Sequence, residues 1–185
     1  MISILLLLSQ FAFSAQNAHH FQTGCYQVGD DTLSSSLVMT DQTWTQVHTA
    51  FEDEACKTPY LIYSTTYATN IKTTDQANTS VPVDLAVTEV TYTLLSDQVA
   101  RALNMSGYCG FSDWAPNKAK VVTGLLCDDY QVPKLKSILY SIYDLEAGAH
   151  GQQLRLGEKT DAVDGSSPQQ RYKTLSDLYY YDSSN

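Results

Sequence analysis

The residues best suited to acid–base chemistry gather around His48. His48 lies in an alternating stretch between Val47 and Thr49, and the acidic residues Glu52 and Asp53 follow it closely. A histidine with a carboxylate partner can act as a general base, so a hydrolase using His48 with Glu52 or Asp53 is one hypothesis. No serine stands in a Gly-x-Ser-x-Gly pattern that would supply a nucleophile. We therefore favour a chain without catalytic residues.

Three acidic clusters are candidates for sugar hydrolysis or calcium binding: 30–31, 52–54 and 128–129. None follows the spacing of an EF-hand loop, and acidic clusters at strand ends are usually solvated turns. We interpret Asp53 as structural, with its carboxylate accepting amides of the turn that leads to Cys56. We accordingly predict no metal site and no cofactor.

Four cysteines are present, at separations of 31, 53 and 18 residues. No Cys-x-x-Cys pair indicates zinc, and an even count in an exported chain predicts two disulfides. Three connectivities are possible, and the spacing does not choose between them. We expect Cys25–Cys56 and Cys109–Cys127, because each of these pairs closes a local unit.

A short apolar run followed by small residues opens the chain, from Met1 to Ala15. This pattern predicts a secretory signal peptide at residues 1–15, with cleavage after Ser14, Ala15 or Ala18. The run is too short to span a bilayer, and no later segment reaches that length. We expect a secreted or periplasmic protein with a single domain over residues 16–185.

Charge and size exclude several classes of partner. Eleven Lys and Arg against twenty Asp and Glu leave a net charge of −9, which argues against binding to nucleic acid or to anionic membranes. Without the leader, roughly 170 residues remain, enough to bury a core without a second subunit. We therefore expect a monomer.

Most of the mature chain is rich in Thr, Val, Tyr and Ile, which favour strands. Period-two alternation predicts strands over 43–51, 60–67 and 85–95. In the second stretch, the alternation places Tyr63 and Tyr67 on one face. In the third, it places Val90, Tyr92 and Leu94 on one side and Leu85 and Val87 on the other.

The second half of the chain predicts a helix, a hairpin and a final strand. Ser96 is an N-cap residue, and the spacing that follows it predicts a short helix over 96–104. Strands over 135–145 and 153–157 are joined by a turn at 147–151, and residues 175–181 predict a last strand. Sequential antiparallel strands with one helix indicate a barrel or a sandwich.

Thirteen Tyr, five Phe and two Trp are many for a domain of this size. Tyr and Trp have apolar bodies and polar tips, and they line cavities for amphipathic ligands. An eight-stranded barrel is wide enough either to be packed solid or to hold one small ligand. For a hollow barrel, the residues that we expect to contact a small apolar or amphipathic ligand are Tyr26, Trp44, Val47, Phe51, Tyr63, Tyr67, Leu139 and Tyr143.

The alternative is a solid barrel whose loops bind a protein or a glycan, since loops on a rigid scaffold often carry such binding. An exposed aromatic patch around Trp114, or at 179–181, would favour this interpretation. The two hypotheses differ in whether the aromatic side chains enclose free volume.

Several motifs along residues 21–181 occur in the order of one known family. They are Gly24-Cys25-Tyr26, Trp44, Phe51-Glu52-Asp53, Cys56, Ala102-Leu103-Asn104, Cys109-Gly110, Trp114, Val122-Thr123, Cys127, Leu154-Arg155-Leu156-Gly157, Asp164-Gly165-Ser166-Ser167 and Arg171. In this order they resemble the adenomatosis-polyposis-coli-down-regulated family, of the lipocalin-like superfamily. The chain departs from the pattern at Tyr26, where the family has Trp, and at Tyr172, where it has Pro.

The resemblance implies a mainly β fold: an antiparallel lipocalin-like barrel with one short helix, two disulfides and a cavity that accepts lipid. Animal members have two such domains and a membrane anchor, and they restrain Wnt signalling by capturing its lipid. Because this chain has one such domain, only the cavity is carried over as an expectation. The expected protein is thus an exported, non-enzymatic binding protein, with a protein partner as a further expectation.

Overall fold

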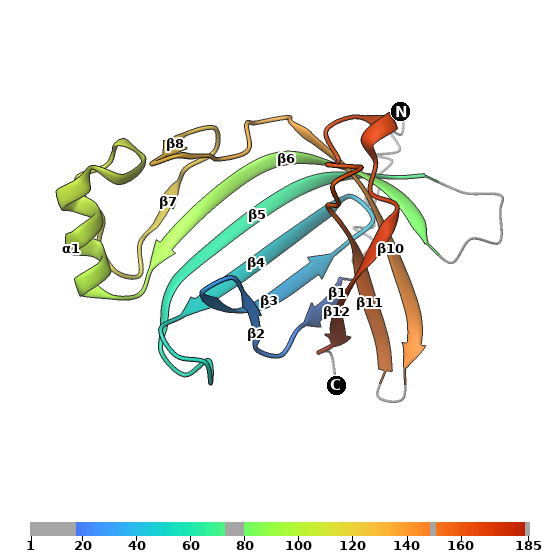
Figure 1. The fold of residues 1–185 in the computed structure, drawn as a ribbon, viewed down its shortest axis with the longest axis horizontal. Coiled ribbons are helices and arrows are strands. Elements are labelled where there is room, and N and C mark those ends of the chain that lie inside the picture. Colours follow the sequence, from blue (N-terminus) through green and yellow to red (C-terminus); the bar gives the residue numbers. More distant parts are fainter. Residues whose placement is uncertain (1–17, 73–79, 149–150, 184–185) are drawn as a thin grey trace, which may run out of the picture.

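The computed structural model describes residues 18–72, 80–148 and 151–183 of the 185-residue chain, so the predicted signal peptide lies outside the described residues. Strands dominate these ranges (Figure 1). The elements in chain order are β1 (His19–Gln22), β2 (Tyr26–Val28), β3 (Asp31–Met39), β4 (Thr43–Phe51), β5 (Pro59–Ile71), β6 (Val81–Leu94), α1 (Asp97–Ser106), η1 (Tyr108–Gly110), β7 (Ala119–Val121), β8 (Leu126–Cys127), β9 (Tyr130–Gln131), β10 (Ile138–Gly148), β11 (Gly151–Glu158), η2 (Pro168–Gln170) and β12 (Thr174–Asp182).

Eight antiparallel strands close into a barrel in the order β3-β4-β5-β6-β10-β11-β12-β1, and β1 pairs with β3 to complete the ring. The short β1 makes this closure, because Phe21 lies opposite Asp182 of β12 on one side and opposite Leu37 of β3 on the other. A closed sheet leaves no unpaired edge in its wall. The expected mainly β antiparallel barrel with one α-helix and two disulfides is therefore confirmed.

A β-bulge at Thr88 changes which side chains of β6 face inward. Thr66 of β5 pairs with Glu89 and the next residue, Tyr67, pairs with Val87, so Thr88 is the extra residue. A bulge reverses the alternation beyond it. The buried side chains of β6 are accordingly Val83, Leu85 and Val87 before the bulge and Val90, Tyr92 and Leu94 after it. The strict alternation predicted for 85–95 is wrong for this reason.

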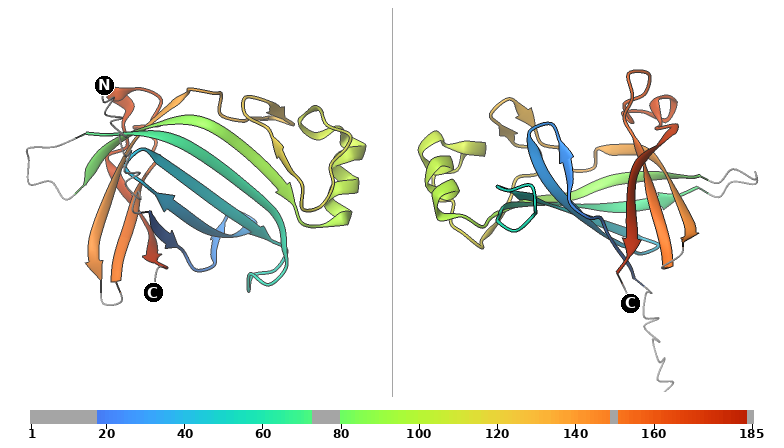
Figure 2. Two further views of the ribbon diagram at one scale, coloured as in Figure 1. Left: turned by 180° about the vertical axis from the view of Figure 1, so that it is seen from behind. Right: turned by 60° about the horizontal axis from the view of Figure 1, so that its bottom comes forward.

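The segment 95–137, which we call the cap segment, connects β6 to β10 and carries α1. The Ser96 hydroxyl accepts a hydrogen bond from the Val99 amide at the start of α1, and Gly107 ends it with φ 68°. This confirms the predicted helix and its N-cap. Both views of Figure 2 show α1 beyond the end of β6, away from β10 to β12. α1 thus lies at one end of the barrel, and the last part of the cap segment returns along β6 as far as Val87.

One buried tryptophan anchors the cap segment. Trp114 is 3% exposed, and the side chain of Asn104 in α1 binds both its backbone amide (2.6 Å) and its carbonyl (3.0 Å). The indole N–H donates to the carbonyl of Tyr108 at 3.2 Å. Trp114 therefore ties α1 and η1 together while its ring fills the core between them.

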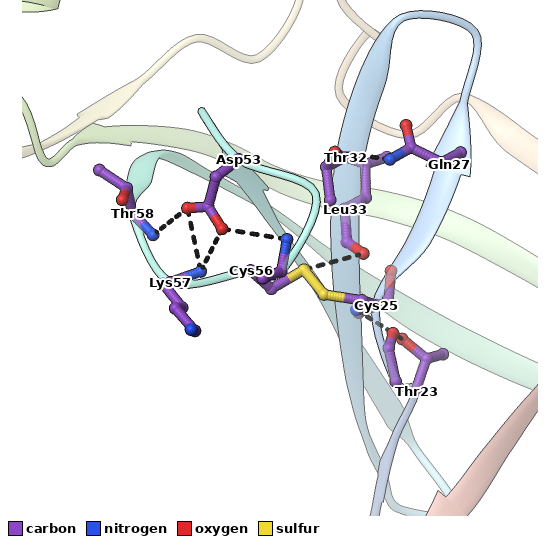
Figure 3. The surroundings of a disulfide bond; sticks show 12 residues. Thr23, Cys25, Gln27, Thr32, Leu33, Asp53, Cys56, Lys57 and Thr58 are labelled. Carbon is purple, nitrogen blue, oxygen red and sulfur yellow. Dashed lines mark hydrogen bonds between the residues drawn. A yellow bond between two sulfur atoms is a disulfide. The ribbon is translucent and has the colours of Figure 1, made fainter.

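The two disulfides are Cys25–Cys56 and Cys109–Cys127, so the expected pairing is confirmed. The first joins the segment before β2 to the turn after β4 (Figure 3). In that turn the Asp53 carboxylate accepts hydrogen bonds from the backbone amides of residues 55, 57 and 58. The structural role predicted for Asp53 is thus confirmed. The second disulfide lies within the cap segment.

Two clusters of buried side chains pack against different halves of β6. The capped end joins the second half of β6 to the cap segment and contains Val87, Val90, Tyr92, Leu94, Ala100, Cys109, Trp114, Val122, Cys127 and Val132. The closed end is built from barrel strands alone and contains Phe21, Leu37, Met39, Trp44, Val83, Leu85, Leu154 and Tyr180. The space between these two clusters is where the candidate site lies.

The remaining strand predictions match the structure to within a few residues. The strand predicted over 43–51 has the bounds of β4, and the predicted hairpin corresponds to β10 and β11. β3 was not predicted, because its serine run 34–36 hides the alternation of Leu33, Ser35 and Leu37 along the inner face. Among the described residues, no helix has the length and apolar character needed to cross a membrane.

Candidate functional site

Two adjoining cavities lie on the inner side of the barrel wall. The outer cavity, about 470 Å³, lies between β4–β6 and the cap segment, and the inner cavity, about 290 Å³, is surrounded by strands from β2 round to β12. Gln46, His48 and Tyr67 line both cavities. Ligand sites for small molecules commonly have volumes of about 300–1,000 Å³. The two volumes together are therefore sufficient for a small ligand.

The wall of the outer cavity follows from the alternation of β5. Leu61, Tyr63, Thr65 and Tyr67 all line it, as expected for every second residue of one strand. The cap segment supplies the facing wall, and the residues that it contributes are Tyr108, Tyr130, Val132 and Pro133. Because Tyr130 is 57% exposed, it lies at the rim of this cavity.

The inner cavity is lined mainly by aliphatic and aromatic side chains. These are Tyr26, Leu37, Trp44, Tyr67, Leu85, Leu139, Leu156, Tyr172, Leu178 and Tyr180. Glu158 is the one acidic residue that lines either cavity within the described ranges, and it is exposed. No Lys or Arg of the described residues lines either cavity. Both cavities therefore present apolar walls without a positive charge.

A set of hydrogen-bonded side chains, which we call the lumen cluster, lies where the cavities meet. It consists of Tyr26, Ser35, Gln46, His48 and Tyr180. The Ser35 hydroxyl lies 2.5 Å from the Tyr26 hydroxyl and 2.6 Å from Nδ1 of His48. The Gln46 amide nitrogen donates to the Tyr180 hydroxyl at 3.1 Å. Strands β2, β3, β4 and β12 thus contribute polar groups to one place.

Burial controls the charge state of the lumen cluster. Removal of the imidazole from water lowers the pKa of His48 to about 4, so the ring is neutral near pH 7. Beside the lumen cluster, burial raises the pKa of Tyr67, which lines both cavities, to about 12, so this phenol is also neutral near pH 7. The His48 ring is stacked on Tyr63 with centroids 4.5 Å apart. The junction between the cavities is therefore polar and uncharged at neutral pH.

The Ser35–His48 pair resembles part of a hydrolase site, but its surroundings lack the other parts. The Ser35 amide donates to the Thr23 hydroxyl at 2.9 Å, so it is not free to stabilise an oxyanion. Within the described ranges no carboxylate lies at ion-pair distance from His48. The Asp53 carboxylate that we considered as its partner is bonded to turn amides instead. The Ser35–His48 pair is therefore suited to hydrogen bonding, and the other groups that a hydrolase needs are not found beside it in the described ranges.

Metal binding has no support in the same region. No group of three His, Cys, Asp or Glu side chains able to hold a metal ion is found in the part of the chain that the structure describes. The acidic cluster that includes Asp53 is a structural turn. A ligand bound in the cavities would therefore be held by apolar contact and by the lumen cluster.

Five of the eight predicted ligand residues line the cavities: Tyr26, Trp44, Tyr63, Tyr67 and Leu139. The other three, Val47, Phe51 and Tyr143, do not line either cavity. Val47 differs in parity from Trp44 in β4, so both cannot face the same side. Tyr143 packs edge-on against Trp44, with ring centroids 5.2 Å apart, and belongs to the closed end. Contact of any of these residues with a ligand stays a prediction.

The polar members of the site were not all recognised from the sequence. Alternation in β4 from the predicted Trp44 would have placed Gln46 and His48 inside. Ser35 belongs to the strand that was not predicted, and no local signal marks it. Tyr180 is 3% exposed, whereas Tyr179 and Tyr181 stack with centroids 6.5 Å apart and Tyr181 is exposed. This separation agrees with the strand predicted over 175–181, because neighbouring residues of a strand face opposite sides.

Comparison with known proteins does not assign the chain to a family. No protein-family model matches the sequence, and a search of curated proteins finds no match either. The resemblance to the adenomatosis-polyposis-coli-down-regulated family thus stays a prediction, and the site is defined by its own geometry.

Proposed function

We propose that this protein is an exported binding protein that holds a small apolar or amphipathic molecule in its barrel without changing it chemically. The observation that carries the proposal is the pair of adjoining cavities, about 470 and 290 Å³, with apolar walls and a hydrogen-bonding cluster between them. Apolar burial supplies affinity, and a few polar groups supply orientation. This is the arrangement that an amphipathic ligand requires.

Export is the second part of the proposal. The two disulfides are of a kind that persists in oxidising compartments, and the opening residues have the pattern of a signal peptide. We expect recombinant protein directed to an oxidising compartment to carry both disulfides. Cleavage near residue 15 would be read directly from the mass of the mature protein.

A second candidate is a module that binds a protein or a glycan through its surface. One observation favours it: Tyr179 and Tyr181 are stacked on the outside of β12, and Arg155 lies over the Tyr179 ring at 5.3 Å. Trp114, the other aromatic residue considered for such a patch, is buried. The cavities are not used by this function, so we rank it below the first.

Native mass spectrometry of the exported protein, followed by lipid extraction, tests the proposal. We expect a bound small molecule, or uptake of a neutral hydrophobic dye such as Nile red by the empty protein. A Thr65→Trp variant places an indole in the outer cavity and should lower the dye affinity by at least about tenfold.

Ser64→Trp is the matched control, because residue 64 is adjacent in β5 and faces the other side of the wall. Dye affinity in this variant should stay within about twofold of the unchanged protein. A folded protein that carries no ligand and takes up neither dye nor lipid would contradict the proposal. Equal loss of affinity in both variants would place the dye outside the cavities.

A further inference from the structure

The junction of the two cavities has polar atoms left for a ligand. Both hydrogen bonds of His48 are made at Nδ1, to Ser35 and, at 3.4 Å, to Tyr26, and its Nε2 has no partner among the described residues. The side-chain amide of Gln46 uses its nitrogen on Tyr180, and its Oε1 likewise has no partner in the described ranges. Both residues line both cavities.

The direction of the hydrogen bonds determines what these atoms offer. The Tyr26 hydroxyl, the Ser35 hydroxyl and the neutral imidazole can each donate or accept, so these contacts permit either direction. In one direction Tyr26 donates to Ser35 and Ser35 donates to Nδ1, and we take this direction for the ligand site. The proton of the neutral imidazole is then on Nε2, which becomes a donor to the cavity. Gln46 Oε1 is an acceptor. A donor and an acceptor on two residues that line the same cavities match one hydroxyl group, which can accept from the first and donate to the second.

The charge of the walls distinguishes a hydroxyl from a carboxylate. No Lys or Arg of the described residues lines either cavity, and the acidic Glu158 is at the exposed margin. A carboxylate at the junction would be buried without a cation, which is strongly unfavourable. In the protein without a ligand, His48 does not supply that cation near pH 7, since burial lowers its pKa to about 4. An uncharged head group meets no such penalty.

Apolar side chains surround the junction on the side of the inner cavity. Leu37, Leu85, Leu139, Leu156 and Leu178 line this cavity and offer no hydrogen bond from their side chains. They suit a hydrocarbon chain whose head group stays at the lumen cluster. The polar end of one ligand can therefore lie at the lumen cluster while its apolar end lies in the inner cavity.

We propose that Gln46 and His48 form a head-group site for an uncharged amphiphile bearing a hydroxyl, such as a long-chain alcohol, in preference to an ionised fatty acid. The hydroxyl accepts a hydrogen bond from Nε2 of His48 and donates one to Oε1 of Gln46. This inference rests on the proposed binding function, and it adds the chemistry of the ligand's polar end.

Displacement of Nile red at pH 7.5 by 1-dodecanol and by dodecanoate, two ligands with the same chain length, tests the inference. We expect the alcohol to displace the dye at a concentration at least about tenfold lower than the acid, because the acid brings an unpaired charge into the cavity. In Gln46→Met and in His48→Phe, this ratio, measured within each variant against that variant's own dye affinity, should fall by about fivefold or more.

Two variants are used because His48→Phe also removes a partner of Ser35 and can impair folding, whereas Gln46→Met keeps the length of the side chain. Thr45→Val, in the same strand and on its other face, is the control and should keep the full preference. Equal or stronger binding of dodecanoate, or an unchanged ratio in both folded variants, would overturn the head-group site while leaving the binding function intact. Failure of every alkyl ligand and of the dye to bind would overturn both.

Discussion

The capped end and the closed end of the same barrel are packed by different means. At the closed end, strands β1, β3, β4, β6, β11 and β12 each send side chains to one cluster. At the capped end, the barrel contributes β6 to the buried cluster, and the cap segment supplies the other buried side chains together with a disulfide. One end is therefore made by the wall itself, and the other by an insertion that packs on the wall.

This difference separates two sources of stability. A change at the closed end affects the pairing of several strands that form the ring. A change in the cap segment affects one such pairing, that of β7 with β6. The cap segment depends instead on Trp114, on the disulfide and on the side chain of Asn104. Stability at the capped end should thus reside in few residues, and at the closed end in many.

The largest expected effect is that of Trp114→Ala at the capped end. Trp114 is 3% exposed, and its loss removes a large buried ring and leaves a cavity, so we expect the free energy of unfolding to fall by about 3–5 kcal/mol. Chemical denaturation measures this change. Met105→Ala, in the same segment but 88% exposed, should change it by less than about 0.5 kcal/mol. A loss below about 1 kcal/mol for Trp114→Ala would show that the cap is not anchored there.

Removal of each disulfide compares the two regions directly. Loop closure alone predicts about 3 kcal/mol for either bridge, slightly more for Cys25–Cys56, because its separation of 31 residues exceeds the 18 of Cys109–Cys127. The sulfurs of the second bridge are buried in the capped end, whereas Cys25 is exposed. We therefore expect the paired change Cys109→Ser with Cys127→Ser to be the more destabilising one.

Denaturation of both paired variants, each compared with the unchanged protein, decides between these two contributions. A greater loss for Cys25→Ser with Cys56→Ser would mean that loop entropy outweighs packing at the capped end. Equal losses would mean that burial of the sulfurs contributes little.

Between the two ends, His48 should make stability depend on pH. Its pKa is lowered from 6.5 to about 4 in the folded protein, so the unfolded chain binds the proton first as the pH falls. The contribution of His48 is complete above pH 6.5 and is lost between pH 6.5 and pH 4, by up to about 3 kcal/mol. The groups that face it are Tyr26, Ser35 and Tyr63, none of which is charged in this range.

The difference between the unchanged protein and His48→Phe, measured across this range, isolates that contribution from the titration of carboxylates elsewhere. We expect the stability of His48→Phe to fall less steeply between pH 6.5 and pH 4. Parallel curves for the two proteins would refute the lowered pKa.

The smallest expected effect concerns Arg171, which spans β6 and β10 on the wall. Its guanidinium donates to the carbonyls of Val83 and Ser141, each at 2.8 Å, and forms an ion pair with Asp84. Arg171→Met should cost about 2 kcal/mol, because two carbonyls and a carboxylate lose a charged donor. Lys72→Met removes the other, half-exposed cation beside Asp84 and should cost less than about 1 kcal/mol. An equal loss of stability in the two variants would show that the hydrogen bonds of Arg171 to the two carbonyls contribute little.

Local signals explain which parts of the fold were predictable. β4, the hairpin of β10 and β11, and the N-cap at Ser96 depend on neighbouring residues, and their predictions were accurate. The bulge at Thr88 was not predicted, because it depends on how β6 pairs with β5. β3 was missed for a related reason. Its inward residue Ser35 is polar, and the reason for a polar residue there is its hydrogen bond to His48 in the neighbouring strand.

The same division applies to the candidate site. Tyr63 and Tyr67 could be assigned to one face from alternation, and both line the outer cavity. Val47 was predicted as a ligand residue together with Trp44, although alternation from Trp44 places it on the other side of the wall. The head-group site could not be predicted, since Gln46 and its partner Tyr180 are 134 residues apart.

The sequence by itself determined the strand periodicity, the start of the helix and the cysteines available for disulfides. Each of these depends on spacing within a short stretch or on residue type. The tertiary structure alone decided that the barrel closes through β1, that space remains inside it, and that polar groups of four strands meet there. Free volume and long-range hydrogen bonds are properties of how distant side chains pack together, and a local pattern carries no information about the volume left over.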